Sequence, residues 1–205
     1  ISKQAWYVGT QAKKAGAIQA DMLQNAWKEN QKKLDHNKNN TLDYILIEGE
    51  QTHFDSIRRT NGFLENSQNL PLHQLANLSA DWQRQLATEK FANLDKTLIH
   101  SAEAVICNND DMALGVIDAC KEKGIKGITV LGIDATADGC TAIESGDMAF
   151  TVYQSASGQG DMVIQTAIAL AKGNDMSKLS GVTKDQKYVW VPFEKVDSSN
   201  VKDYE

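Results

Sequence analysis

The sequence lacks any apolar run long enough to cross a membrane and has no excess of basic residues. A membrane-spanning helix needs about 20 consecutive apolar residues, whereas the runs here are short, as in YILI at 44–47. Lys and Arg number 21 against 27 Asp and Glu, for a net charge of −6. Nothing in such a chain offsets phosphate repulsion across a broad surface. We therefore expect neither direct membrane insertion nor a nucleic-acid partner.

Cysteine is also scarce. Cys107, Cys120 and Cys140 are widely spaced, odd in number and flanked by apolar or small residues. Cysteines of this kind behave as small hydrophobic side chains, so we expect burial rather than metal binding or nucleophilic catalysis. One disulfide between two of them is compatible with the count, which leaves the redox compartment open.

What is present is a rhythm of short apolar runs and longer segments of helical period. With 205 residues, 41% of them hydrophobic, the chain can bury a proper core and lies between one large domain and two small ones. The pattern predicts strands near 6–10, 42–49, 72–78, 102–110, 127–135 and 148–154, and helices near 12–32, 54–67, 81–94, 111–123, 137–145 and 156–172. Such alternation predicts an α/β fold, a parallel sheet with helices on both faces in three layers.

Polar side chains follow several of the predicted strands. In parallel sheets, ligands bind beyond the carboxyl ends of the strands. The candidates at these ends are His53, Asp55, Arg59, Asn109, Asp110, Asp134 and Gln154, with Trp82 near the start of the predicted helix at 81. An aromatic ring surrounded by carboxylate, amide and guanidinium groups suits a polyhydroxy ligand.

Each of these residues also has a purely structural interpretation. Asp or Asn after a strand is often a helix cap, and Asp110 or Asp111 fits that role. Trp82 fits a core anchor, and Arg59 fits a surface charge beside Arg58. Their convergence at one sheet edge favours the ligand site over these separate roles.

A second motif lies at DHNKNNTLD, residues 35–43. Asp35, Asn37, Asn39, Thr41 and Asp43 have the alternate spacing of an EF-hand calcium loop. The twelfth position, where such a loop needs a bidentate glutamate, is Leu46. Either the loop is a polar turn that binds nothing, or the missing carboxylate comes from elsewhere in the chain.

Several motifs together carry a family resemblance: YVGT, DHNKNNTLD, EGEQTHFDSIRR, AVICNNDDMALG, VLGIDATADG and YVWVPFEKVD. In this order they resemble the bacterial periplasmic D-galactose/D-glucose-binding proteins, which are type I periplasmic binding proteins. The resemblance implies a non-enzymatic monosaccharide-binding protein for ABC import and chemotaxis. Its partners would be a galactose or glucose ligand, the membrane subunits of an ABC transporter and a chemoreceptor. It would be periplasmic, or extracellular and tethered to a membrane.

The resemblance also implies residue roles. Glu103 would complete a calcium site made by Asp35, Asn37, Asn39, the carbonyl of Thr41, and Asp43. For the sugar, His53, Asp55 and Arg59 would form hydrogen bonds, Trp82 would stack, and Asn109 and Asp134 would bind further hydroxyl groups. Gln154 stands where the family usually has asparagine, and its longer side chain puts the preferred hexose in doubt.

Members of this family have two lobes, and the resemblance divides this chain between them. Residues 8–154 with about 187–205 would form the carboxyl-side sugar-binding lobe, and about 155–186 would pack on the other lobe, whose first part is absent from this sequence. If this chain acts alone in solution, the apolar face of the helix at 156–172 should be exposed or find another partner; it is made by Met162, Val163, Ile164, Ala167, Ile168 and Leu170. Such proteins bind the sugar between both lobes, and one lobe supplies only part of the contacts, so this chain alone should bind sugar weakly.

Three other functions compete with an importer component. Asp55 paired with Asp134 or Glu50 would suit a glycosidase, although no nucleophile with a base and oxyanion donor is visible. A sugar-sensing receptor ectodomain and a LacI-type effector domain share the expected fold. The calcium loop argues against the cytoplasmic regulator, because it suits millimolar calcium outside the cell.

Overall fold

The computed structural model describes residues 5–204, which divide into two compact units. The larger unit contains residues 12–153 and the segment from 195 onward; the smaller contains the residues up to 11 and 154–194. Residues 8–11 and 187–194, which the resemblance assigns to the larger lobe, lie in the smaller unit. Glu205, the last residue of that predicted lobe, and Ile1–Gln4 lie outside the described residues.

The elements follow the predicted order along the chain. The larger unit holds α1 (Ala12–Leu34), β2 (Leu42–Glu48), α2 (Phe54–Asn66), β3 (Leu72–Ser79), α3 (Arg84–Ala92), α4 (Lys96–Ser101), β4 (Ala104–Cys107), α5 (Asp110–Lys123), β5 (Thr129–Leu131), α6 (Ala137–Glu144) and η2 (Val201–Tyr204). β6 (Thr151–Gln154) and β8 (Phe193–Val196) pair with each other and contain the boundary residues of both units. The short α4 has no counterpart in the sequence prediction, and α3 begins later than predicted because Asp81 and Trp82 have positive φ angles of 50° and 68°.

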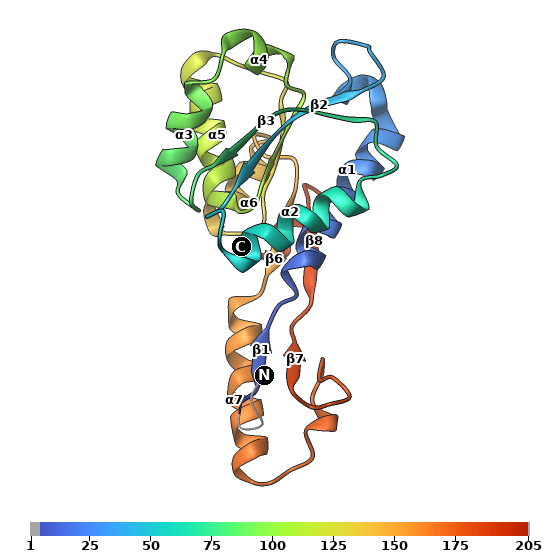
Figure 1. The fold of residues 1–205 in the computed structure, drawn as a ribbon, viewed down its shortest axis with the longest axis vertical. Helices are drawn as coiled ribbons and strands as arrows, with labels where there is room; N and C mark the ends of the chain where they lie inside the picture. The colour runs from blue at the N-terminus through green and yellow to red at the C-terminus, as the bar shows by residue number, and fades with distance from the viewer. Residues whose placement is uncertain (1–4, 205) are drawn as a thin grey trace. The chain divides into compact units, whose positions relative to one another are not determined.

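The main sheet is parallel throughout. Its strand order is β3-β2-β4-β5, with Ile45 paired to Val105 and Val105 to Val130. Parallel bridges at Leu131–Phe150 and Asp134–Tyr153 carry the same direction on to the segment of β6. All these strands therefore end at one edge of the sheet (Figure 1).

Helices cover both faces of this sheet (Figure 1). Ile45 and Ile47 of β2 are buried on the side of α3 and α5, in the cluster that contains Phe91 and Met112. The alternate residues of β2 pack on the opposite side with Leu23 of α1 and Phe63 of α2; they are Leu42, Tyr44 and Leu46. A strand whose two faces are both buried reads as a continuous apolar run. The predicted three-layer α/β fold is confirmed.

Two glycines set the distance between α1 and α2. A Cβ on Gly16 would lie 1.9 Å from the carbonyl oxygen of Arg59, and one on Gly62 would lie 2.1 Å from that of Lys13. The two backbones approach more closely than any side chain would allow. This contact fixes the helix that carries Arg59.

The smaller unit has a smaller core. It contains β1 (Tyr7–Gly9), α7 (Ala156–Ala171), η1 (Met176–Lys178) and β7 (Tyr188–Trp190), and β1 pairs in parallel with β7. Ala169, Met176 and Val189 are buried together.

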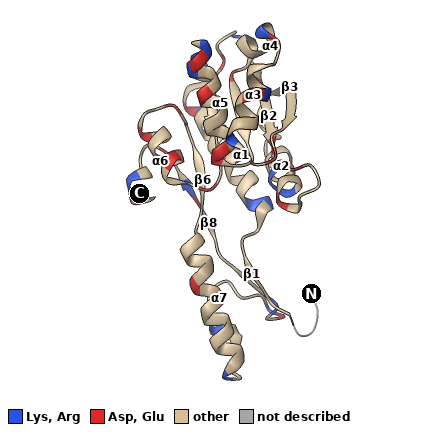
Figure 2. Cartoon of the chain, turned by 90° about the vertical axis from the view of Figure 1, so that its left-hand side faces the viewer, with Lys and Arg blue, Asp and Glu red and all other residues tan. Residues whose placement is uncertain are grey.

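The helix α7 carries few charged residues (Figure 2), and several of its exposed side chains are apolar. Val163, Ile164 and Ile168 are 50%, 60% and 48% exposed, and Ala167 is exposed as well. The predicted exposed face is therefore confirmed for these four residues. Met162 and Leu170 instead find a partner, since they pack against the small core.

The three cysteines are free thiols. Cys107 and Cys140 are buried and Cys120 is half-buried, so the prediction of small buried side chains is confirmed for two of them. No helix within residues 5–204 has both the length and the apolarity that a membrane crossing requires.

Candidate functional site

Six of the seven predicted sugar-binding residues belong to the larger unit and follow the strands of its sheet. His53, Asp55 and Arg59 come after β2, Trp82 after β3, Asn109 after β4 and Asp134 after β5. The seventh, Gln154, is the last residue of β6 and belongs to the smaller unit. Arg59 contacts both Asp134 and Trp82, and the residue Trp82 is contacted in turn by His53 and Asn109.

Arg59 lies at the centre of this group. Its side chain is nearly buried, and Nη1 donates a hydrogen bond of 2.6 Å to the carbonyl of Asn108. The same nitrogen lies 3.4 Å from Oδ1 of Asp134, and the guanidinium stands 5.6 Å from the centre of the Trp82 ring. The alternative of a surface charge is wrong for Arg59. It describes Arg58 instead, which is exposed and covers the ring of Phe54.

Trp82 occupies a position that only a glycine opposite makes possible. A Cβ on Gly49 would come within 2.3 Å of the indole ring. His53 meets the ring edge-on, with centroids 5.3 Å apart and planes at 80°. The left-handed backbone of Trp82, unusual for a large side chain, stores strain in a turn that presents an aromatic ring at the sheet edge.

Asn109 caps the helix that follows it and also lies against the turn of Trp82. Its Oδ1 accepts a 3.0 Å bond from the backbone N–H of Met112 and so caps α5. Its Nδ2 lies 3.4 Å from the carbonyl of Trp82. The cap therefore holds the amide beside the turn that carries the indole.

Asp134 sits in a strained turn, with φ of 126°. Burial raises the pKa of its carboxyl group to about 7, against the opposing effect of the Arg59 charge, while Asp110 and Asp111 raise it further. A carboxyl group whose pKa is raised this far is typical of a functional site.

His53 and Asp55 form the start of α2. His53 is exposed and caps the helix, since its Nδ1 accepts a 3.1 Å bond from the N–H of Asp55. This bond leaves Nε2 as the protonated nitrogen of the neutral ring. Asp55 itself is half-buried in the first turn.

Asn108 was not among the predicted site residues, but it bonds to the segments that carry them. It is 1% exposed, and its Oδ1 accepts bonds from the N–H of Gly49 and the hydroxyl of Ser56, at 3.2 and 3.1 Å. Its carbonyl binds Arg59. The available signal was the run of four polar residues, NNDD at 108–111, directly after a buried strand.

The opposite edge of the sheet carries the loop at 35–43. Glu103, placed just before β4 and 2% exposed, reaches across to it. Its Oε1 accepts from the N–H of His36 at 2.6 Å and of Asn37 at 3.2 Å, and Oε2 from that of Asp43 at 3.0 Å. The structure thus brings a glutamate from a later segment to the loop, where the resemblance places it.

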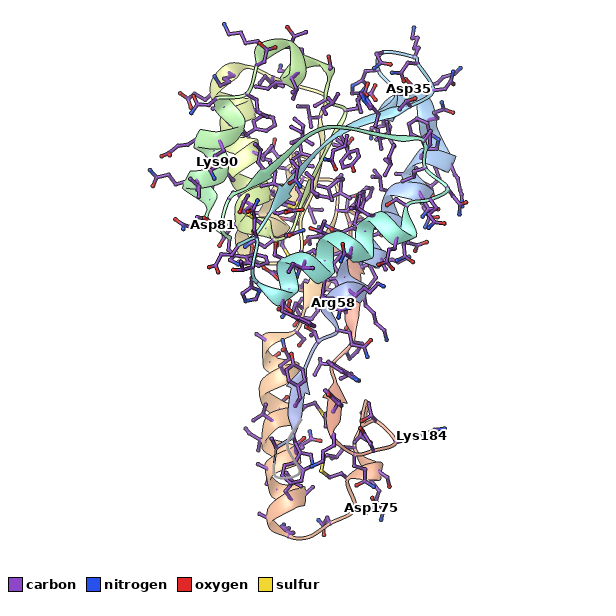
Figure 3. All side chains as sticks on the ribbon, in the orientation of Figure 1. Asp35, Arg58, Asp81, Lys90, Asp175 and Lys184 are labelled. Atoms are coloured by element: carbon purple, nitrogen blue, oxygen red, sulfur yellow. The ribbon has the colours of Figure 1, made fainter. Side chains whose placement is uncertain are left out.

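Asp35 begins this loop at the end of α1 (Figure 3). Its two carboxylate oxygens accept bonds of 3.0 Å from the backbone N–H groups of Asn39 and Asn40. Asn40 stands at the turn with φ of 60°, a conformation that asparagine tolerates. The backbone therefore curls around the first carboxylate.

Asp43 closes the loop. The side-chain amides of Asn37 and Asn39 both point at its Oδ2, at 2.8 and 3.3 Å, and His73 Nδ1 lies 2.7 Å from Oδ1. A rotation of an asparagine side-chain amide by half a turn exchanges the positions of its oxygen and its nitrogen. Both amides thus have the reach to turn an oxygen toward the same point.

The charges of the loop test its fit to a cation. Asp35, Asp43 and Glu103 are all 5% exposed or less. In the described part of the chain no Lys or Arg pairs with any of them, and the exposed His73 is their one ionic partner. Three buried carboxylates that share a single exposed histidine are costly, so the donor set fits a hard divalent cation.

Carboxylates, histidines and cysteines alone do not make the site. Within residues 5–204 no three such side chains are grouped as metal ligands. A calcium ion takes six to eight oxygens, among them amide and backbone carbonyls. Asn37, Asn39 and Thr41 carry oxygens of this kind beside the three carboxylates.

Comparison with known proteins places the chain in a family. The profile of the family described as "Periplasmic binding protein domain" matches residues 1–175. The D-galactose/methyl-galactoside binding periplasmic protein MglB of Haemophilus influenzae is 33% identical over 205 residues, with 98% of this chain and 61% of that protein covered. The chain thus spans less than two thirds of this relative.

Two solved structures have the same fold. An ABC transporter solute-binding protein from Bacillus halodurans with bound myo-inositol has a TM-score of 0.77 at 28% identity, covering 98% of this chain and 63% of the other. One from Actinobacillus succinogenes with bound D-allose has a TM-score of 0.79 at 21% identity, covering 97% and 64%. This chain belongs to the periplasmic binding protein domain family.

Proposed function

We propose that the carboxyl edge of the main sheet is one half of a monosaccharide-binding site. The observation that carries the proposal is the convergence of Arg59, Asp134 and Trp82, which follow three different strands. The guanidinium of Arg59 lies 3.4 Å from the carboxylate of Asp134 and 5.6 Å from the centre of the Trp82 ring. Planar donors and acceptors beside an aromatic ring are what a sugar requires, since its hydroxyl groups bond in pairs and its C–H faces stack.

The charges favour a neutral sugar over an acidic one. Arg59 already faces the carboxylate of Asp134, so it has no uncompensated charge to offer an anionic ligand. Asp55 adds a further acidic group at the start of α2. A ligand with hydroxyl groups alone can donate to these carboxylates and accept from the guanidinium.

The relatives narrow the choice of sugar. MglB is named for galactose and methyl-galactoside binding, and the motifs that carry the sequence resemblance belong to galactose- and glucose-binding proteins. We infer D-galactose or D-glucose as the ligand. Gln154 is the position where a different hexose preference would arise.

The family membership supports a role in transport. We propose that the protein acts outside the cytoplasm and delivers its sugar to the membrane subunits of an ABC importer, without catalysis of its own. A chemoreceptor as a second partner, and with it a role in chemotaxis, is a prediction that follows from the resemblance alone. Hydrolysis of aryl glycosides by the protein would contradict the non-enzymatic role.

We also propose that the loop at 35–43 binds calcium. Asp35, Asn37, Asn39, the Thr41 carbonyl, Asp43 and Glu103 would hold the ion, which would neutralise the three buried carboxylates. This proposal is supported by the hydrogen bonds that Glu103 accepts from three backbone N–H groups of the loop, which hold its carboxylate beside the other proposed ligands. Because its ligands all lie in the larger unit, the ion would stabilise that unit whether or not sugar is bound.

The first test is calorimetric titration with D-galactose and D-glucose, in calcium, of both the 205-residue chain and the full-length protein that includes its flanking sequence. We expect tight binding of one hexose by the full-length protein and weak binding by the chain alone. Trp82→Ala should reduce the affinity strongly. A folded, calcium-loaded full-length protein that binds neither hexose would contradict the proposed ligand.

A further inference from the structure

Asp110 is a buried carboxylate that is not one of the proposed ligand-binding residues. It is fully buried, next to Asn109 at the start of α5. The glycines around it leave room for its oxygens, because a Cβ would come within 2.1 Å of Oδ1 at Gly132 and within 2.3 Å of Oδ2 at Gly139. The fold is shaped around this carboxyl group.

Its hydrogen bonds lead away from its own helix. Oδ1 accepts a 2.6 Å bond from the hydroxyl of Thr151, and Oδ2 accepts from the N–H and hydroxyl of Thr136, at 2.8 and 3.3 Å. Capping of α5 is performed by Asn109. The interpretation of Asp110 as a mere helix cap is therefore wrong.

These bonds enclose the turn that carries Asp134. The backbone is left-handed at Asp134 and at Ala135, with φ of 126° and 53°. Before these two residues, the N–H of Asp110 donates to the carbonyl of Ile133 at 2.8 Å; after them, Thr136 donates to the Asp110 carboxylate.

Thr151 connects the same carboxylate to the middle of the turn. Its hydroxyl oxygen accepts from the N–H of Ala135 at 3.3 Å while its proton is donated to Asp110. Two consecutive left-handed residues without glycine are strained and persist only when their surroundings hold them. Here Asp110 and Thr151 hold the turn, through their hydrogen bonds to Ala135 and Thr136.

We propose that Asp110 is a positioning residue, which holds the turn at 133–136 in the conformation that presents the Asp134 carboxylate to the ligand. This inference rests on the proposed sugar-binding function of the same edge. Asp110 does not itself contact the ligand. It acts through Thr136 and Thr151.

The test compares Asp110→Asn with Asp111→Asn in the full-length protein. The two residues are adjacent and undergo the same chemical change, but Asp111 is exposed. An amide at 110 turns its NH2 group either toward the N–H of Thr136, which needs an acceptor, or toward Thr151, whose hydroxyl must then stop donating and accept instead. By titration with D-galactose and D-glucose at a pH well above 7, where the Asp134 carboxyl group is ionised, we expect Asp110→Asn to bind about tenfold more weakly or worse and Asp111→Asn to bind as the unchanged protein does. Equal affinity for both folded variants would overturn the inference.

A second readout does not depend on the sugar. In Asp110→Asn, amide hydrogen exchange should accelerate by about tenfold or more at Ala135 and Thr136, while the amides of β2 should keep their protection. Unchanged exchange at these two positions would overturn the positioning role. If the unchanged protein binds neither hexose, the proposed ligand fails, and the exchange rates still decide the role of Asp110.

Thr151 provides the variant to use if Asp110→Asn does not fold. Thr151→Val keeps the shape but removes the hydroxyl group, whereas Thr151→Ser keeps the hydroxyl. We expect faster exchange at Ala135 and weaker binding in Thr151→Val, with both restored in Thr151→Ser. A Thr151→Val protein that matches Thr151→Ser in both measurements would contradict the inference.

Discussion

The two edges of the main sheet are built from different side chains. The amino edge gathers the buried carboxylates Asp35, Asp43 and Glu103 around a loop rich in asparagine. The carboxyl edge combines Arg59 with Asp134 and with the ring of Trp82. The first arrangement suits a structural cation, and the second suits a neutral ligand that binds reversibly.

The difference shows what a parallel sheet offers a binding protein. Its strands all begin at one edge and end at the other, so a structural site and a ligand site are kept apart by the length of the buried strands. Disturbing the amino edge should therefore change stability more than sugar affinity. Disturbing the carboxyl edge should do the reverse.

The largest effect is expected from Glu103→Gln. This change removes an acceptor from a buried carboxylate that binds three backbone N–H groups, and we expect the free energy of unfolding to fall by about 2–4 kcal/mol. Urea denaturation in calcium measures it, with the exposed Glu144→Gln as the control. A loss of sugar affinity larger than the loss of stability would contradict the separation of the two edges.

Calcium removal comes next. At calcium concentrations about 100-fold above the dissociation constant, binding stabilises a protein by about 2.7 kcal/mol, or roughly 5–10 °C in Tm for a chain of this size. We expect chelator to lower the Tm of the unchanged protein by this amount. Glu103→Gln should respond much less, and a melt that chelator leaves unchanged would refute the calcium site.

At the carboxyl edge, pH should change the affinity for sugar. The carboxyl group of Asp134 has a pKa raised to about 7 by burial, so below that pH it is increasingly protonated and loses its charge as an acceptor. Affinity should then fall by up to about tenfold for each pH unit below 7 and level off above it.

The matched variants for this prediction are Asp134→Asn and Asp138→Asn. The first should bind weakly and independently of pH near neutrality, while the second, whose side chain is 75% exposed, should follow the unchanged protein. Calorimetric titration at several pH values makes the comparison. A pH-dependent affinity that survives in Asp134→Asn would assign the titration to another group.

The smallest effect is expected from His73→Phe at the amino edge. His73 is bonded to the buried Asp43, but its own side chain is 64% exposed, and ion pairs that water screens contribute about 1 kcal/mol or less. We expect a loss of stability within that limit, measured by urea denaturation against His100→Phe. A larger loss would mean that His73, rather than the loop amides, holds Asp43 in place.

Much of the fold was predictable because the strands are buried on both faces. Apolar runs such as YILI mark such strands directly, and the helices between them have clear periods. The start of α3 was not predictable in the same way. The helical pattern extends back to Asp81, but the left-handed turn at Asp81 and Trp82 is imposed by the ring packing against Gly49.

The residue types of both sites were visible in the sequence by themselves. The spacing of oxygens at 35–43 and the polar residues after each strand follow from local chemistry, and so does the expectation of a parallel sheet. Only the tertiary structure decided which residues act together. It brought Glu103 to the loop, buried Arg59 against Asn108 and Asp134, and turned Asp110 away from its helix toward Thr136 and Thr151. These partners are far apart along the chain, and a buried polar group bonds to whatever the packing brings within reach.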